Sequence, residues 1–342
     1  MERRKFIALL GSAVVVGALS HASLAADYKP EFKMSVIVTE DTAWGRAATR
    51  FADAVRLRTD GRIKIKNYFE GRLFAGEQTT EFKLMQEGTA DFAIGSTVNW
   101  VPQVNQLNLF LLPFLFSDHA ALDAVQIGEP GKRLFKLMEQ KGVVPLAWGE
   151  NGFREVTNST RAIRRPDDLQ GLKIRVPPVP IVGEIFEALG AKPVAINWDQ
   201  ALEAFRRQSV DGQENPISLI IPYKLWAVHN HVTLWHYAID PLILAVSAKT
   251  WATLSPEDRD ILQKVGEAIM AEQKKEARGG VTDNVLADSL EKIYQMEVTR
   301  PQPVDIEAFR QKTKVVYDKW AQQIGVEIVR GAEKLAENRK PN

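Results

Sequence analysis

The sequence contains no cysteine in its 342 residues. Disulfide bonds, thiol nucleophiles and thiolate metal sites are therefore excluded together. Histidine is also scarce, with five residues. His229, His231 and His236 lie close together in the sequence, but no acidic or thiol ligand accompanies them at a metal-binding spacing. We interpret them as structural or surface residues and expect no metal site.

Charge of one sign is not in excess, since 44 basic and 43 acidic residues leave a net charge of +1. Without a basic excess or a polybasic run, neither nucleic acid nor a stable membrane contact is indicated. The sequence has no G-x-S-x-G, no P-loop and no glycine-rich dinucleotide motif after a strand. Its glutamates are scattered, and no two of them suggest a catalytic pair. These absences argue against an enzyme and against a bound cofactor.

The first 25 residues predict a cleavable secretory signal peptide. A positive segment (residues 2–5) precedes an apolar stretch (6–19) that is too short to span a bilayer comfortably, and Ser23-Leu24-Ala25 provides a cleavage site. The alternative is an N-terminal membrane anchor. No later apolar run reaches 18 residues, so we expect a soluble periplasmic protein. Arg3-Arg4 resembles a twin-arginine signal without its flanking residues, which leaves the Sec and Tat routes both open.

From residue 32 onward, strand-like and helix-like segments alternate. The strand "FKMSVIV" (32–38) is followed by a helical pattern over 41–60, and the same rhythm continues to "VVPLAW" (143–148). It restarts after residue 151, and Ser255-Pro256 predicts the start of a long helix. This order indicates an α/β fold with parallel-rich sheets, and the length suits two lobes with a cleft between them.

Two arginines and an asparagine are the polar residues that suggest a binding site. In "GLKIRVPP" (171–178), apolar and basic residues alternate, which predicts a short strand with Arg175 near its carboxyl end. We place Arg154 at the start of the next upstream strand and Asn215 in a turn. Ligands of open α/β sheets lie at the carboxyl ends of strands, and an arginine fork binds a carboxylate through two hydrogen bonds. A solvated outer face is the alternative for Arg175, and an ion pair with Glu155 or Glu150 is the alternative for Arg154.

Four segments carry a resemblance to a known family. They are "GTADFAIGS" (88–96), "LNLFLLPFLFSD" (107–118), "GFREVTNSTRAIRRPDDLQGLKIRVP" (152–177) and "VDGQENP" (210–216). With these segments the chain resembles the solute-binding subunit of tripartite ATP-independent periplasmic (TRAP) transporters, the DctP-like family. One departure is Ser209, because the family usually has glycine before "VDG".

The resemblance implies a two-lobed periplasmic-binding-protein-like fold that closes on its ligand. Lobe I would comprise 26–151 plus about 240–279, and lobe II 152–239 plus about 280–342. Arg175 would form a bidentate salt bridge with the ligand's carboxylate, and Arg154 and Asn215 would complete the site. The implied function is an extracytoplasmic receptor that delivers an organic acid to TRAP membrane subunits. A ligand-sensing periplasmic module and an exported enzyme on the same fold are the alternatives.

Aromatic side chains are the candidates for the rest of the pocket wall, with ordinary core packing as the alternative for each. The candidates are Trp44, Phe74, Trp100, Trp148 and Trp198. Trp44 and Trp198 are favoured because each lies at the start of a predicted helix. No acid or second basic group is evident in this part of the pocket. We therefore expect a ligand with one carboxylate and an apolar body rather than a sugar acid.

Overall fold

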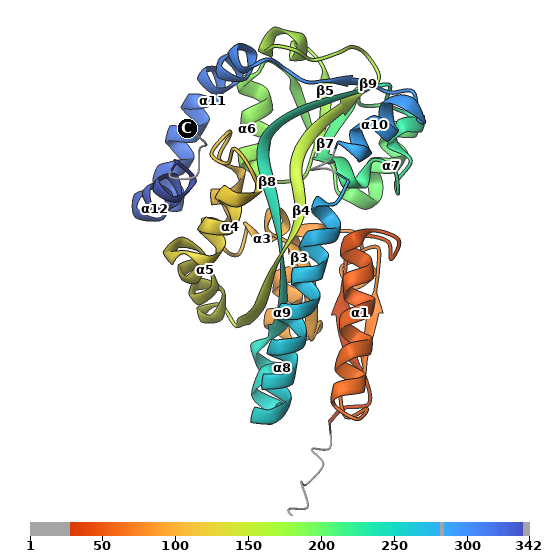
Figure 1. Ribbon diagram of the computed structural model, residues 1–342, viewed down its shortest axis with the longest axis vertical. Helices are drawn as coiled ribbons and strands as arrows, with labels where there is room; N and C mark the ends of the chain where they lie inside the picture. The colour runs from red at the N-terminus through yellow and green to blue at the C-terminus, as the bar shows by residue number, and fades with distance from the viewer. Residues whose placement is uncertain (1–27, 281–283, 338–342) are drawn as a thin grey trace, which may run out of the picture.

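The computed structural model describes residues 28–280 and 284–337, so the predicted signal peptide lies outside the described residues. The described chain forms one nine-stranded mixed sheet with helices on both faces, which confirms the predicted α/β class (Figure 1). Its strands are β1 (Phe32–Ser35), β2 (Ile65–Tyr68), β3 (Phe92–Ser96), β4 (Val143–Asn158), β5 (Lys173–Val176), β6 (Lys192–Ala195), β7 (Gly212–Pro216), β8 (His231–Ser247) and β9 (Glu297–Thr299).

The helices follow the predicted pattern, with more breaks than expected. The α-helices are α1 (Ala43–Arg58), α2 (Glu81–Glu87), α3 (Thr97–Trp100), α4 (His119–Ile127), α5 (Glu129–Gln140), α6 (Pro180–Ala188), α7 (Trp198–Arg206), α8 (Ala248–Thr253), α9 (Pro256–Arg278), α10 (Val285–Lys292), α11 (Pro303–Ile324) and α12 (Val326–Glu337). The 3-10 turns are η1 (Gln78–Thr80), η2 (Asn105–Leu111), η3 (Pro166–Leu169), η4 (Ile217–Leu219) and η5 (Leu225–Ala227).

Two long antiparallel strands join the two ends of the sheet. The strand order is β2-β1-β3-β8-β4-β7-β5-β6, and β9 pairs with β8. Parallel strands β2-β1-β3 form the first sheet half, and parallel strands β7-β5-β6 form the second. In Figure 1, β4 and β8 run from the first half, beside α1 and α9, up to β5 and β7. The fold therefore has two ends connected by a two-stranded bridge.

The bridge differs from the sequence prediction. We expected separate strands at 143–148 and at "FREVTNS", but β4 continues through both segments as one 16-residue strand. Register shifts between Pro145 and Ala147, Glu150 and Gly152, and Arg154 and Val156 bend it instead of ending it. Gly152 has a φ of +126°, which only glycine adopts without strain. Arg154 thus lies within a long strand, not at the start of one.

The hydrophobic core is divided by sheet face and not by sheet half. Alternate residues of β3 point to opposite faces: Ala93 belongs to one buried cluster, and Phe92 and Ile94 to the other. Each cluster contains residues from both halves, such as Ile174 in the first cluster and Trp198 in the second. Long-range packing along both faces therefore joins the two ends of the molecule.

Candidate ligand-binding site

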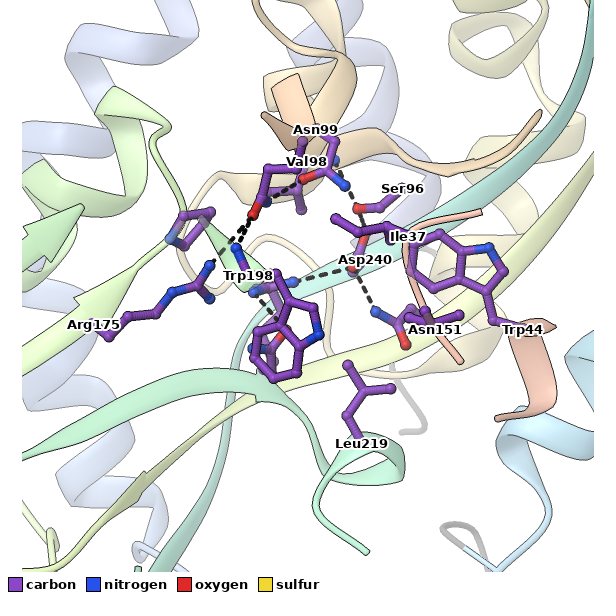
Figure 2. A pocket seen from close by; sticks show the side chains of 15 residues that line it. Ile37, Trp44, Ser96, Val98, Asn99, Asn151, Arg175, Trp198, Leu219 and Asp240 are labelled. Carbon is purple, nitrogen blue, oxygen red and sulfur yellow. Dashed lines mark hydrogen bonds and ion pairs between the residues drawn. The ribbon is translucent and has the colours of Figure 1, made fainter. Parts of the chain in front are cut away.

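A cavity lies between the two sheet halves, at the carboxyl ends of β3 and β5. Its empty volume is about 370 Å³, which includes space open to solvent. The side chains that line it come from loops, helix starts and the bridge strands, as Figure 2 shows. They are Ile37, Val38, Trp44, Gln78, Ser96, Val98, Asn99, Asn151, Arg154, Arg175, Pro177, Trp198, Asn215, Leu219 and Asp240.

Arg175 is one of two buried arginines that line this cavity, and it forms no ion pair among the described residues. The side chains before and after it in β5 are buried in the core, and Arg175 itself is 2% exposed. Its Nε donates to the carbonyl of Ile196 at 2.9 Å, and its Nη2 lies 3.4 Å from Gln78 Oε1. No acid of the described residues lies within ion-pair distance of Arg175. Burial, aided by the nearby charge of Arg154, lowers the pKa of Arg175 to about 10, although the charges of Glu214 and Asp199 raise it.

Arg154 also lines the cavity, but its charge is balanced by protein groups. Its Nε and Nη2 donate to the two carboxylate oxygens of Glu214 at 2.5 and 2.7 Å, and its Nη1 lies 3.1 Å from Asp240 Oδ2. Burial alone would lower the pKa of Arg154, but these two carboxylates raise it above its ordinary value. The alternative of an ion pair therefore applies, with Glu214 and Asp240 in place of Glu155 or Glu150.

Asn215 and Asp240 connect Arg154 to the cavity wall. Asn215 accepts from Arg154 Nη2 at 3.2 Å and donates to Gln213 at 2.7 Å. Asp240 accepts from Ser96 at 2.6 Å and from Asn151 at 2.8 Å, as drawn in Figure 2. Burial raises the pKa of Asp240. Hydrogen bonds and ion pairs join these side chains into one polar network, most of which lines the cavity. Its members are Asn151, Arg154, Glu214, Asn215 and Asp240.

Two of the predicted aromatic residues line the cavity. Trp44 is held by a 2.7 Å hydrogen bond from its Nε1 to the carbonyl of Ile94. The ring centroid of Trp198 lies 5.4 Å from the Arg175 guanidinium carbon and 4.9 Å from the ring centroid of Tyr223, which is nearly perpendicular to it. In Figure 2 these two indoles lie on different sides of Asp240. They supply apolar surface beside the anchoring cation.

The other three predicted aromatic residues lie outside this cavity. Phe74 lines a neighbouring hollow that it shares with Trp198 and Tyr223. Trp100 packs against Phe82 in the core of the first half, and its Nε1 donates to Glu81 at 3.0 Å. Trp148 is stacked on Phe135 at 4.5 Å and touches Phe110. For Trp100 and Trp148, core packing explains the position completely.

Sequence reasoning missed five polar residues of the cavity. They are Gln78, Ser96, Asn99, Asn151 and Asp240. We expected no acid there, and the position of Asp240 corrects that expectation. A signal was present, because Asp240 is the one charged residue in the otherwise apolar "YAIDPLILAV" (237–246). Gln78 and Asn99 belong to short helical turns, where no periodic pattern marks an inward-facing side chain.

Two of these amides keep unused hydrogen-bonding groups in the cavity. Asn99 accepts from Gln78 at 2.6 Å through its oxygen, and within the described ranges its Nδ2 has no partner. Asn151 donates to Asp240, and in the same described set its Oδ1 has no partner. The cavity thus offers a cationic fork, a free donor and a free acceptor, all within a small volume.

The three neighbouring histidines contact separate groups. His229 lies 2.8 Å from Thr157, His231 pairs with Glu297 at 3.0 Å, and His236 pairs with Glu155. In the part of the chain that the structure describes, no cluster of three metal-binding side chains occurs. No helix of the described residues is long and apolar enough to cross a bilayer.

A bridged two-ended α/β fold with an unbalanced buried arginine in its cleft defines a protein that holds a small organic anion. The chain belongs to the bacterial extracellular solute-binding protein family 7 (DctP), whose model matches residues 34–323. This confirms the family resemblance, and members of the family are TRAP transporter solute-binding proteins.

Three similar proteins show the range of this family. A TRAP periplasmic solute-binding protein from Ralstonia eutropha H16, solved with bound (S)-2-acetolactate, is 45% identical with a TM-score of 0.90, covering 91% of this chain and all of that one. The sugar-acid-binding protein of Advenella mimigardefordensis, solved with galactonate, is 28% identical with a TM-score of 0.84, covering 90% and 98%. The C4-dicarboxylate-binding periplasmic protein of Rhodobacter capsulatus is 28% identical, covering 96% of this chain and 97% of that protein.

Proposed function

We propose that this protein is an extracytoplasmic solute receptor that binds a small organic acid through Arg175. The observation that carries the proposal is the buried guanidinium of Arg175, which forms no ion pair among the described residues. A ligand carboxylate would supply the missing negative charge and accept two parallel hydrogen bonds from the fork. Arg154 would then orient Asn215 and Asp240, because its own charge is already balanced.

The ligand class follows from the remaining groups of the cavity. The free Nδ2 of Asn99 suits a keto or hydroxyl oxygen, and Asn151 and Asp240 suit a hydroxyl donor. Trp44, Val98 and Leu219 add apolar wall. We assign a short monocarboxylate with a 2-hydroxy or 2-oxo group and a small apolar body. The acetolactate bound by the Ralstonia protein has this chemistry.

Closure of two lobes would bury the ligand. We divide the chain into lobe I (26–151 plus about 240–279) and lobe II (152–239 plus about 280–342), with the bend of β4 near Gly152 as part of the hinge. Release to TRAP membrane subunits in the periplasm would follow, after removal of residues 1–25 as a signal peptide. We propose that the protein binds and releases its ligand unchanged.

A thermal-shift screen of the mature protein tests this function. Acids that bind the folded state raise the melting temperature in proportion to ln(1 + [L]/Kd). We expect a rise with short 2-hydroxy or 2-oxo acids and none with their methyl esters, which lack the charge that pairs with Arg175. Equal shifts from acid and ester would contradict the carboxylate anchor. Conversion of the acid during incubation, followed by NMR, would instead support the enzyme alternative.

A further inference from the structure

Gln78 connects the two sides of the cavity. It is the first residue of η1, on the lobe I side, and is 4% exposed. Its Oε1 accepts from the backbone N–H of Trp198 at 2.8 Å and lies 3.4 Å from Arg175 Nη2. Its Nε2 donates to Asn99 at 2.6 Å. One neutral side chain therefore holds together groups from both lobes at the point where the anchoring arginine lies.

The position occupied by the Gln78 oxygen suits a negative charge. It faces the Arg175 guanidinium and the first N–H of α7, whose N-terminus carries a partial positive charge. Asn197, the N-cap residue of α7, makes no side-chain cap bond, although "NWDQ" (197–200) predicts a capping box. The Gln78 side chain thus accepts from the first N–H of α7, which has no acceptor within the helix.

The amide makes these hydrogen bonds without neutralising the arginine. A neutral carbonyl accepts from a guanidinium but leaves its positive charge unbalanced, and an unbalanced buried cation is costly. The contacts of Gln78 alone therefore favour contact between the lobes only weakly. The carboxylate of a ligand adds the charge that the amide lacks, so that ligand and Gln78 together favour closure.

We propose that Gln78 is the residue that makes lobe closure depend on the ligand's carboxylate, because it joins the lobes at Arg175 without balancing its charge. This inference rests on the proposed function. It assigns Gln78 a role in selecting anionic ligands, although its own side chain is neutral. A carboxylate at position 78 would provide the missing charge from within the protein.

The test is Gln78→Glu, with Gln86→Glu as the matched control. Gln86 lies on α2 of the same lobe, outside the cavity, and among the described residues its side chain bonds only to the Lys141 carbonyl. Without any ligand, we expect the Gln78→Glu protein to have a smaller radius of gyration by X-ray scattering than wild type, and a higher melting temperature. We expect the Gln86→Glu protein to match wild type in radius of gyration and to show no rise in melting temperature, because it loses the hydrogen bond to the Lys141 carbonyl. An unchanged radius of gyration for Gln78→Glu overturns the inference.

The second arm measures binding of 2-oxo and 2-hydroxy acids by calorimetry. Gln78→Glu should weaken binding at least thirty-fold, because its carboxylate competes with the ligand for Arg175. Gln78→Met keeps the side-chain volume and adds no charge, but it removes the amide that bonds to both lobes. It should weaken binding about three- to ten-fold. Binding by Gln78→Met at wild-type affinity also overturns the inference. If no acid binds wild type or Gln86→Glu, the proposed function fails, whereas the ligand-free scattering still decides the role of Gln78.

Discussion

Arg154 and Arg175 lie in one cavity, yet their surroundings give them different roles. Arg154 pairs with Glu214 and Asp240, whereas Arg175 has only carbonyl oxygens as hydrogen-bond acceptors within the described residues. A buried ion pair is satisfied within the protein, whereas an unpaired buried cation favours an anionic ligand. Substitutions at the two arginines should therefore change different properties of the protein.

Arg175→Ala should nearly abolish binding of the acid. Loss of one member of a buried charge pair costs about 2–5 kcal/mol, or roughly thirty-fold to a few thousand-fold in Kd. Arg175→Lys should recover only part of this, since lysine keeps the charge but loses the fork. Calorimetry measures the effect, and Arg207→Ala, at an exposed site, is the control. Binding within about threefold of wild type by a folded Arg175→Ala protein would exclude the anchor role.

Arg154→Ala should lower stability more than Arg175→Ala does. It leaves Glu214 and Asp240 as buried acids without their cation, which costs about 3–5 kcal/mol. Arg175→Ala removes a charge whose burial is itself unfavourable, so the ligand-free protein should lose little stability. Urea unfolding of the ligand-free proteins compares the two. Equal losses of unfolding free energy would argue against this division of roles.

Glu81→Gln should stabilise the protein above pH 7. Burial raises the pKa of Glu81 to about 7, although Ser35 and Trp100 donate to it at 2.7 and 3.0 Å. A carboxyl with a raised folded-state pKa stabilises fully below its unfolded value near 4.5, and this contribution is lost as pH rises through 7. Each pKa unit corresponds to about 1.4 kcal/mol, so the gain at pH 8 should be a few kcal/mol.

The comparison is unfolding free energy at pH 4 and pH 8. Glutamine can accept from Trp100 and donate to Ser35, which preserves both contacts. Glu87→Gln, at the exposed end of the same helix, is the control. The stability difference between Glu81→Gln and wild type should grow between pH 4.5 and 7. A difference that is the same at pH 4 and pH 8 would disprove the assignment.

At the scale of elements, most strands and helices were predicted from the sequence, because each has a regular spacing of apolar residues within its own short segment. The pattern in "KIRV" placed Arg175 correctly near the end of β5, and Ser255 caps α9 as expected. The break at Gly128 between α4 and α5 and the continuity of β4 were not predicted. Gly149 and Gly152 lie between the two predicted strands, and only pairing with β8 along the whole bridge keeps both segments in one strand.

A site residue could be predicted from the sequence only where the strand or helix that carries it also shows a local pattern that marks the residue. Arg175 met this condition. The ion pairs of Arg154 join β4 to β7 and β8, residues 60 and 86 positions apart, and no local pattern encodes such a pairing. Whether an aromatic side chain faces core or cavity also depends on its neighbours in space. Trp148 was therefore a candidate as well as Trp198, although of these two residues only Trp198 lines the cavity.

Loops on opposite sides of the cavity carry a contact that should form on closure. The backbone N–H of Thr39, after β1, donates to the hydroxyl of Tyr223 at 3.0 Å. Tyr223→Phe should weaken ligand binding about two- to ten-fold, since one net hydrogen bond is worth about 0.5–1.5 kcal/mol. Tyr317→Phe, on α11, serves as the control. Unchanged affinity in the Tyr223→Phe protein would mean that the contact forms equally without ligand.

At the scale of the whole molecule, the cavity between the lobes should select the ligand by size and by polarity together. Its empty volume is about 370 Å³, with space open to solvent included, and it combines one buried cation that forms no ion pair with a free donor and a free acceptor. A second carboxylate would meet Asp240 and no second unpaired cation, which disfavours C4 dicarboxylates. A long sugar acid would place several hydroxyl groups against Trp44, Val98 and Leu219, where few partners exist.

Short branched 2-hydroxy and 2-oxo acids should therefore bind at least tenfold more tightly than succinate or galactonate. Competition calorimetry against one reference acid ranks all the ligands under the same conditions, and fluorescence reports closure through Trp44 and Trp198, which line the cavity. Asn99→Ala should reduce the preference for 2-oxo and 2-hydroxy acids over the unsubstituted acid. It removes the Asn99 Nδ2, the donor that we expect to bond to the ligand's 2-oxo or 2-hydroxy oxygen. If succinate or galactonate binds tenfold more tightly than every short monocarboxylate, the assignment of the cavity's polar groups is wrong, while the Arg175 anchor would still stand.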